Sequence, residues 1–224
     1  MIGRATALMI WNRTNETPEQ PDPPEEVGTS GSFRRWLAGM ISPELRIEAE
    51  SDPLTGLNNV RTDERMVRKA LDDRRKEPGT ATVLVRFRAD VDNFKVFNDV
   101  HGHAAGDRAL DLIGRVLRGS VRMGEILVSP ARVGGDEFAM TLVIPAEESP
   151  DRIRRRLENE VSRALRREGF HRAGDREIGV SVGYAVAGPD TPLRLLDAEA
   201  DRSARSRKSA NGRSRPRPPR GRRA

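Results

Sequence analysis

A pair of glycines between two apolar segments restricts the fold of this chain more than any other feature. Gly134-Gly135 separates residues 126–132 from residues 138–144, and both segments are rich in apolar side chains. Glycine adopts the backbone angles of a tight turn at no steric cost, so the pattern predicts a β-hairpin. Asp136 and Glu137 lie at its tip. Two carboxylates held rigidly in that position suit a hard divalent cation, although a polar hairpin tip needs no function.

Helix-like and strand-like segments alternate around this hairpin. The expected helices cover residues 62–76, 94–100, 106–118, 151–167 and 193–208. The expected strands cover residues 83–92, 126–132, 138–144 and 177–186. This order predicts an α/β sandwich, with helices on both faces of a mixed central sheet.

The expected strand over residues 83–92 ends in two aspartates. Asp90 and Asp92 are two positions apart, so both point to one side of the strand and Val91 points to the other. Ligands in α/β sheets bind beyond the carboxyl ends of strands, which is where these acids lie. The alternative is that Asp92 or Asn93 caps the next helix, whose first backbone amides also favour a phosphate group.

An amide and a carboxylate lie on either side of the break at Gly102. Asn98 and Asp107 together offer the donors and acceptors that guanine requires, although spacing alone does not establish this role. His101 and His103 resemble a metal-binding pair. The chain has three His and no Cys, so we do not expect a zinc site.

Two arginines interrupt the strand that ends at Asp90. Arg86 and Arg88 lie on the same side of the strand as Asp90. Burying an unpaired guanidinium is costly, so we expect Arg88 to pair with an acid near the site.

The ends of the chain have a different composition from its middle. We interpret residues 1–50 as an N-terminal extension, made of a flexible linker over 12–32 and a short helix after it. Residues 202–224 hold ten Lys/Arg and no acid, which leaves 30 basic and 34 acidic residues elsewhere. We interpret residues 212–224 as a disordered basic tail. Weak attachment to nucleic acid or anionic lipid is the alternative, but the tail lacks aromatic residues that stack on bases.

The apolar residues near the start do not predict a membrane segment. The run over residues 5–11 is too short to span a bilayer, and no convincing cleavage site follows it. Cysteine is absent, which is compatible with a reducing compartment. We therefore expect a cytoplasmic protein without a membrane span.

Five segments resemble, in order and spacing, the motifs of the GGDEF domain, the catalytic module of diguanylate cyclases. They are Asp52-Pro-Leu-Thr-Gly-Leu-Asn-Asn59, Asp90-Val-Asp-Asn-Phe-Lys-Val-Phe-Asn98-Asp99, Gly102-His103-Ala-Ala-Gly106-Asp107, Arg132-Val-Gly-Gly-Asp-Glu-Phe138 and Val180-Ser-Val-Gly183. Each motif is common by chance, whereas five in register are specific. The resemblance implies the palm-like fold of nucleotidyl cyclases for residues 51–211.

The resemblance also implies an activity, which is the condensation of two GTP into cyclic di-GMP with release of pyrophosphate. Each subunit would hold one GTP, so catalysis would require a homodimer with Mg²⁺ or Mn²⁺. The implied metal ligands are Asp90, the carbonyl of Val91, Asp136 and Glu137, of which Asp136 and Glu137 are also the implied catalytic residues. The implied substrate-binding residues are Asn93, Phe94, Lys95, Asn98, Asp107 and Lys208, and the signature loop adds Gly134, Gly135 and Phe138. Within this set, Asn98 and Asp107 would bind guanine, and Lys95 and Lys208 the phosphates.

Some positions depart from the family pattern. Glu125 and Val128 stand where many members carry the Arg-x-x-Asp pair that binds the product, so we expect no product inhibition through that site. In the last helix Arg205 replaces a usual Tyr, and Gly212-Arg213 comes one residue late. The alternative function is therefore a catalytically weak or inactive GGDEF module that binds GTP or docks a partner.

Overall fold

The computed structural model of the protein describes residues 50–76, 81–188 and 190–213, and in this part of the chain a four-stranded sheet has the order β2-β3-β1-β6. Its strands are β1 (Thr82–Asp92), β2 (Ile126–Arg132), β3 (Glu137–Pro145) and β6 (Gly179–Val186). A separate hairpin pairs β4 (Arg172–Ala173) with β5 (Arg176–Glu177). The helices are α3 (Val60–Lys76), α4 (Phe94–His101), α5 (His103–Gly119), α6 (Pro150–Arg167) and α7 (Leu193–Arg213).

The sheet pairs its strands antiparallel, and one parallel bridge lies beside it. β1 pairs with β3 and β6, and β2 pairs with β3, all antiparallel. The parallel bridge joins Asn58 of the loop before α3 to Ala131 of β2. The expected α/β sandwich with a mixed sheet is confirmed, and this bridge supplies its parallel part.

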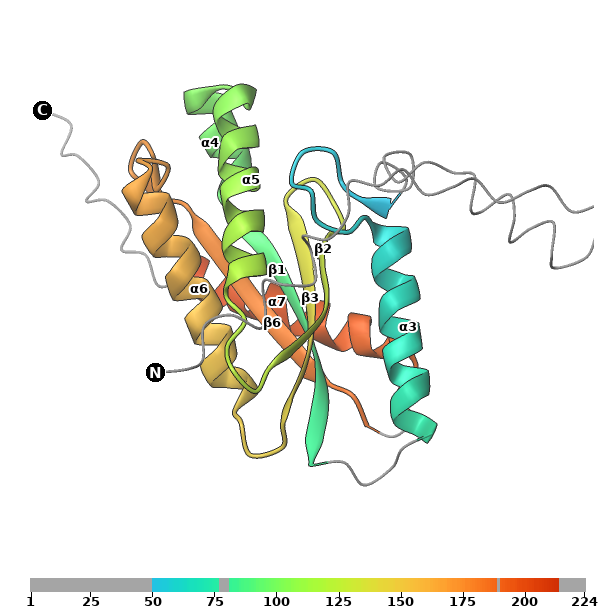
Figure 1. Ribbon diagram of the computed structural model, residues 1–224. Coiled ribbons are helices and arrows are strands. Elements are labelled where there is room, and N and C mark those ends of the chain that lie inside the picture. The colour runs from blue at the N-terminus through green and yellow to red at the C-terminus, as the bar shows by residue number, and fades with distance from the viewer. Residues whose placement is uncertain (1–49, 77–80, 189, 214–224) are drawn as a thin grey trace, which may run out of the picture. The chain divides into compact units, whose positions relative to one another are not determined.

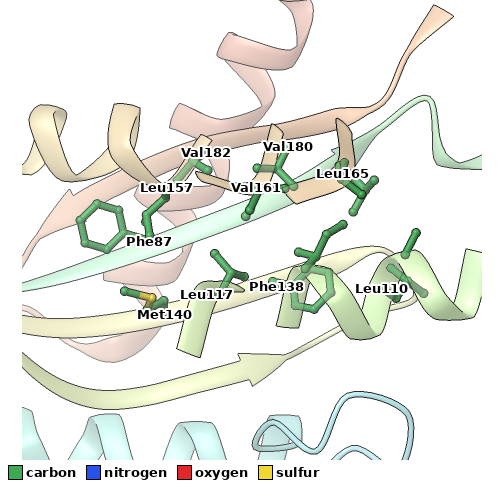
Figure 2. Close-up of a cluster of buried hydrophobic side chains, with 14 of the residues drawn as sticks. Phe87, Leu110, Leu117, Phe138, Met140, Leu157, Val161, Leu165, Val180 and Val182 are labelled. Carbon is green, nitrogen blue, oxygen red and sulfur yellow. The ribbon is translucent and has the colours of Figure 1, made fainter. Parts of the chain in front are cut away.

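Helices cover both faces of the sheet, as expected. α5 and α6 lie on one face, and α3 and α7 pack on the other (Figure 1). The apolar side chains of α5 and α6 meet those of β1, β3 and β6 in the main core, which Figure 2 shows in close-up. A second cluster joins α3 and α7 to the opposite face of the sheet through Leu84. No helix in the described ranges is long and apolar enough to cross a membrane.

The element boundaries follow local signals, with a few differences from the expected ranges. α3 begins at Val60 because the Asn59 side chain accepts a hydrogen bond from the Thr62 amide and caps the helix. α5 begins at His103, and α7 continues to Arg213. The expected strand over residues 177–186 is two strands, and the β4–β5 hairpin was not predicted. Strands of two residues are too short to produce an alternating pattern.

Arg86 interrupts an otherwise apolar strand, and a buried ionic network explains how the strand accommodates it. Arg86 and Asp63 are each only 1% exposed, and two of the three guanidinium nitrogens bind the Asp63 carboxylate at 2.9 and 2.5 Å. Arg86 Nε donates to Asp197 at 2.8 Å, and Arg86 Nη1 also donates to the Thr141 hydroxyl. Burial lowers the pKa of the Arg86 guanidinium, but the two carboxylates outweigh this and raise it. Arg86 therefore remains charged in the core.

One face of β1 is joined to α7 by three ion pairs in succession, which we term the β1–α7 ladder. The pairs are Arg86–Asp197, Arg88–Asp201 and Asp90–Lys208. Alternate residues of a strand are separated by roughly 6.6 Å and helical residues four apart by about 6 Å, so the first two pairs match in spacing. The last pair has the opposite polarity, with the acid on the strand and the base on the helix.

Gly183 of β6 brings α7 close to the sheet. A Cβ atom at Gly183 would lie 2.0 Å from the Ala204 nitrogen and 2.6 Å from the Ala200 carbonyl oxygen. Since both are backbone atoms, they cannot move aside without displacing the helix. Gly183 and the small alanines of α7 therefore set the distance across which the ladder forms.

The Arg86 network leads to a stability prediction. Asp63→Ala removes the carboxylate that binds Arg86 through two hydrogen bonds, and should lower the free energy of unfolding by about 3–5 kcal/mol. Glu64→Ala is the matched control, because Glu64 is the adjacent residue and forms an exposed ion pair with Arg68. The control should cost less than about 1 kcal/mol. Urea denaturation measures both, and equal costs would contradict the structural role of Asp63.

Candidate active site

The Gly-Gly hairpin has a closed turn with the second acid at the start of β3. The amides of Val133 and Gly134 both donate to the Glu137 carbonyl, at 2.9 and 3.3 Å. A Cβ atom at Gly134 would lie 3.1 Å from the Glu137 carboxylate, so glycine leaves room for that side chain. Phe138 is fully buried and anchors the hairpin in the main core. The expected anchored tip with two acids is therefore present.

A salt bridge ties this hairpin to the loop over residues 52–59. Arg132 binds the Asp52 carboxylate at 3.2 Å and donates to the Gly135 carbonyl at 2.8 Å. Burial raises the pKa of the Asp52 carboxyl, but hydrogen bonds from Thr55 and the charge of Arg132 outweigh it and leave the pKa below its usual value. Figure 1 shows this loop beside the hairpin tip. The sequence motifs contained both residues, but reasoning from sequence gave neither of them a role.

The two acids of the hairpin lie beside the end of β1. Asp90 is the register partner of Glu137, and the Val91 amide donates to the Asp136 carbonyl at 3.1 Å. The structure therefore brings together the four residues that the resemblance assigns to the metal. Asp90 and Val91 are on β1 and Glu137 is on the adjacent β3, whereas Asp136 is in the turn between β2 and β3.

Two oxygen atoms at the end of β1 contact the same cationic group, the ammonium of Lys208. Its ammonium group contacts both the Asp90 carboxylate and the Val91 carbonyl oxygen. Carboxylate and carbonyl oxygens are the ligands that a hard divalent cation prefers. These two oxygens are of the kind that binds a divalent cation, and Asp136 and Glu137 follow on the adjacent hairpin.

Two acids of the site are paired with basic side chains. Asp90 pairs with Lys208, and Glu137 lies 3.6 Å from the guanidinium of Arg88. Within the described ranges, no three His, Asp or Glu side chains are grouped so as to hold a metal ion. The expectation that Arg88 pairs with an acid near the site is confirmed, and its shorter contact is to Asp201 at 2.6 Å.

Asp92 has a different environment from Asp90. Ser181 donates a hydrogen bond to the Asp92 carboxylate at 2.8 Å. Burial raises the pKa of the Asp92 carboxyl above its usual value, and the charges of Asp90 and Glu158 add to this effect. The alternative in which Asp92 or Asn93 caps α4 through its side chain is not supported, because Asn93 at the N-cap makes no such bond.

Of the two residues expected to bind guanine, Asn98 provides a buried acceptor beside α5. The Asn98 Oδ1 atom is buried and has no hydrogen-bond partner. A Cβ atom at Gly106 would lie 1.9 Å from this oxygen and 3.2 Å from the Phe94 ring. Gly106 is therefore required for the position of Asn98, and Asp107 follows it on the exposed side of α5. An unsatisfied buried acceptor is a feature that a ligand donor would complete.

The remaining expected site residues lie around α4. The Asn93 backbone is left-handed, with a φ of 58°, and its side chain donates to the Glu177 carbonyl at 2.9 Å. Lys95 is exposed at the start of α4. The His101 ring nitrogen is 2.8 Å from the Arg172 carbonyl oxygen, and the ring packs on Phe97. These contacts give His101 a structural role.

Glu125 occupies the position at which we expect product binding to be lost. Its carboxylate is bound by both terminal nitrogens of Arg156, at 2.7 Å each. The Glu125 side chain is 5% exposed. A buried carboxylate would repel a phosphate group at this position, and the bound arginine is already neutralised.

Known proteins similar to this chain include members of the family that its motifs resemble. The family described as "Diguanylate cyclase, GGDEF domain" matches residues 49–214. Diguanylate cyclase DgcS of Shewanella oneidensis is 30% identical over 80% of this chain and 55% of its own length. An uncharacterised protein of Mycobacterium tuberculosis is 34% identical over 75% of this chain and 25% of its own length. The chain thus spans a quarter to about half of these relatives.

Solved structures have the same fold. A microbial GGDEF domain studied for its interaction with cyclic di-GMP has a TM-score of 0.58 and 28% identity, and the match covers 75% of this chain and 96% of that one. The coiled coil and GGDEF domain of DgcB from Caulobacter crescentus, in complex with c-di-GMP, has a TM-score of 0.60. Its identity is 24%, over 80% of this chain and 88% of that chain, so it supports the fold. The profile match, the relatives and the site geometry agree, and the chain belongs to the GGDEF domain family of diguanylate cyclases.

Proposed function

We propose that this protein condenses two GTP molecules into cyclic di-GMP and pyrophosphate. The register between Asp90 and Glu137 carries the proposal, because it puts acids of two motifs side by side at one end of the sheet. The buried acceptor of Asn98 is on α4, which follows the end of β1 directly. Family membership and relatives named diguanylate cyclase support the same reaction.

The reaction is an in-line displacement at phosphorus. The 3′-hydroxyl of each GTP attacks the α-phosphorus of the other. Each attack forms one phosphodiester bond and releases one pyrophosphate, so two GTP give cyclic di-GMP and two pyrophosphates. A bound Mg²⁺ or Mn²⁺ stabilises the negative charge that develops on the attacking and leaving oxygens. Asp90, the Val91 carbonyl, Asp136 and Glu137 would hold it.

The protein's own residues orient the substrate and handle its charge. In this proposal Glu137, whose side chain is 46% exposed, accepts the proton of the attacking hydroxyl. Lys208, with its ammonium already at Asp90, adds positive charge where the phosphates bind. The exposed Lys95 and the first backbone amides of α4 do the same from the other side. Asn98 and Asp107 hold the guanine.

Each domain provides one GTP site, so the condensation requires two copies facing each other. We therefore propose a homodimer as the active form. GTP and magnesium are available in the cytoplasm, and we place the reaction there.

The alternative is a GGDEF module that binds GTP or a partner without turnover. The observation that favours it is the pairing of Asp90 with Lys208 and of Glu137 with Arg88, because both acids are already neutralised by the protein. In an active enzyme, the metal and the substrate compete successfully with these internal pairs.

A product assay separates the two functions. Purified protein incubated with GTP and Mg²⁺ should form cyclic di-GMP, identified by its mass, and removal of the divalent cation should stop the reaction. Asp136→Asn should reduce the rate by about 100-fold or more, because one metal-binding carboxylate is lost. Asp175→Asn is the matched control, since Asp175 is exposed in the β4–β5 turn.

The outcomes of this assay are distinct. Absence of product at high protein concentration, with GTP binding retained, would favour the alternative. An Asp136→Asn enzyme as active as the Asp175→Asn control would exclude the metal assignment.

Guanine recognition gives a second prediction. The Asn98 oxygen accepts from the hydrogens on N1 and N2 of guanine, so Asn98→Ala should weaken GTP binding by about 3- to 10-fold. Asn159→Ala on α6 is the control. ATP has no hydrogen on its ring N1, and its binding should be weak in all three proteins. Calorimetric titration measures the affinities, and equal GTP affinity in the two variants would contradict the role of Asn98.

The third prediction concerns feedback. Because Glu125 is a buried carboxylate bound to Arg156, added cyclic di-GMP should not inhibit the enzyme non-competitively. Initial rates measured at several GTP concentrations separate this effect from competition at the active site. Non-competitive inhibition by micromolar product would show that the chain binds it at a second site.

A further inference from the structure

Arg88 lies in the active site but has no role in the reaction as described above. It is the middle arginine of the β1–α7 ladder, and 15% of its side chain is exposed. Its Nε donates to Asp201 of α7 at 2.6 Å, and its terminal nitrogen lies 3.6 Å from the Glu137 carboxylate. A small pocket is lined by Arg88, Ala89, Asp90, Glu137, Asp201, Ala204 and Arg205. One guanidinium thus contacts an acid of the hairpin and an acid of the last helix within the pocket.

We propose that Arg88 is a positioning residue that fixes the Glu137 carboxylate and the last helix relative to Asp90. The inference rests on the proposed function, since it concerns the orientation of a residue in that reaction. Glu137 is held from β3, and Lys208 is held from α7. Arg88 is attached to both elements and stands on the strand that bears Asp90, two residues before it.

The close packing at Gly183 makes this arrangement rigid. Gly183 is the register partner of Arg88 on β6, and the backbone at Ala204 lies directly over it. Asp201 is therefore held at a fixed height above Arg88. The planar guanidinium can contact two carboxylates in a fixed fork, whereas a lysine ammonium has no such fork.

Arg88 differs from Arg86, which is structural. Arg86 and Asp63 are both buried, so removal of either side chain leaves the charge of the other buried and out of reach of water. The partners of Arg88 are 46% and 33% exposed, and water can solvate both after its removal. We therefore expect Arg88 variants to fold, with the loss confined to the geometry of the site.

The test uses the full chain with Arg88→Ala, Arg88→Lys and Asp197→Asn. Asp197→Asn breaks the first pair of the ladder, outside the pocket, while Arg86 keeps Asp63, so it controls for weaker attachment of α7. Amide hydrogen exchange over residues 201–208 reports on that attachment without any reaction. Steady-state kinetics with GTP and Mg²⁺ report on the site, and a thermal unfolding midpoint confirms the fold.

Arg88→Ala should lower kcat by about 10- to 100-fold, because the reacting groups are misplaced by a fraction of an ångström to about 1 Å. KM should change by less than about threefold, since substrate contacts remain. Exchange over residues 201–208 should rise at least about fivefold. Arg88→Lys keeps one ion pair and should lie between wild type and Arg88→Ala in kcat. Asp197→Asn should keep kcat within about threefold.

Two results would overturn the inference. One is a folded Arg88→Ala protein with wild-type kcat or wild-type exchange in the last helix. The other is an Asp197→Asn protein that loses as much kcat as Arg88→Ala, because helix attachment alone would then explain the effect. A wild-type protein that forms no product contradicts the proposed function itself, and the exchange measurement then decides whether Arg88 ties α7 to β1.

Discussion

The neutralisation of one buried cation determines how the elements around the candidate active site fit together. Arg86 is enclosed between α3, the sheet and α7, and its guanidinium is satisfied only if each of these elements presents a partner at the correct distance. Asp63 comes from α3 and Asp197 from α7. A shift of either helix along the sheet would leave a charge in the core, so the network specifies the register of both helices as well as their contact.

The same register extends to the candidate active site. The face of β1 that carries Arg86 continues through Arg88 to Asp90, and the facing side of α7 continues from Asp197 through Asp201 to Lys208. Asp90, which we propose as a metal ligand, is thus the final member of this series of ion pairs. The basic side chains become more exposed along the series, from 1% at Arg86 through 15% at Arg88 to 39% at Lys208. The enclosed arginine contributes specificity of packing, whereas the ion pair at Asp90 is more exposed and therefore weaker.

Most of the fold could be predicted from sequence, because its signals are local. The Gly-Gly pair and the apolar segments on either side of it predicted β2 and β3 to within one residue. The β4–β5 hairpin could not be predicted, because two residues per strand carry no periodicity. The site residues could be named by resemblance, and the structure brings Asp90 and Glu137 into register. Arg86 and Arg88 could be recognised as unusual, but their partners lie as far as 113 residues away.

The sequence by itself determined the family, the order of the elements and the identity of the acids at the hairpin tip. These depend on turn chemistry, periodicity and motif spacing, which act over a few residues. Only the tertiary structure decided which charges neutralise one another, and therefore that Lys208 contacts Asp90 and that Arg88 contacts both Glu137 and Asp201. Electrostatic pairing depends on distance in space and on burial, and neither quantity exists until the helix is packed against the sheet.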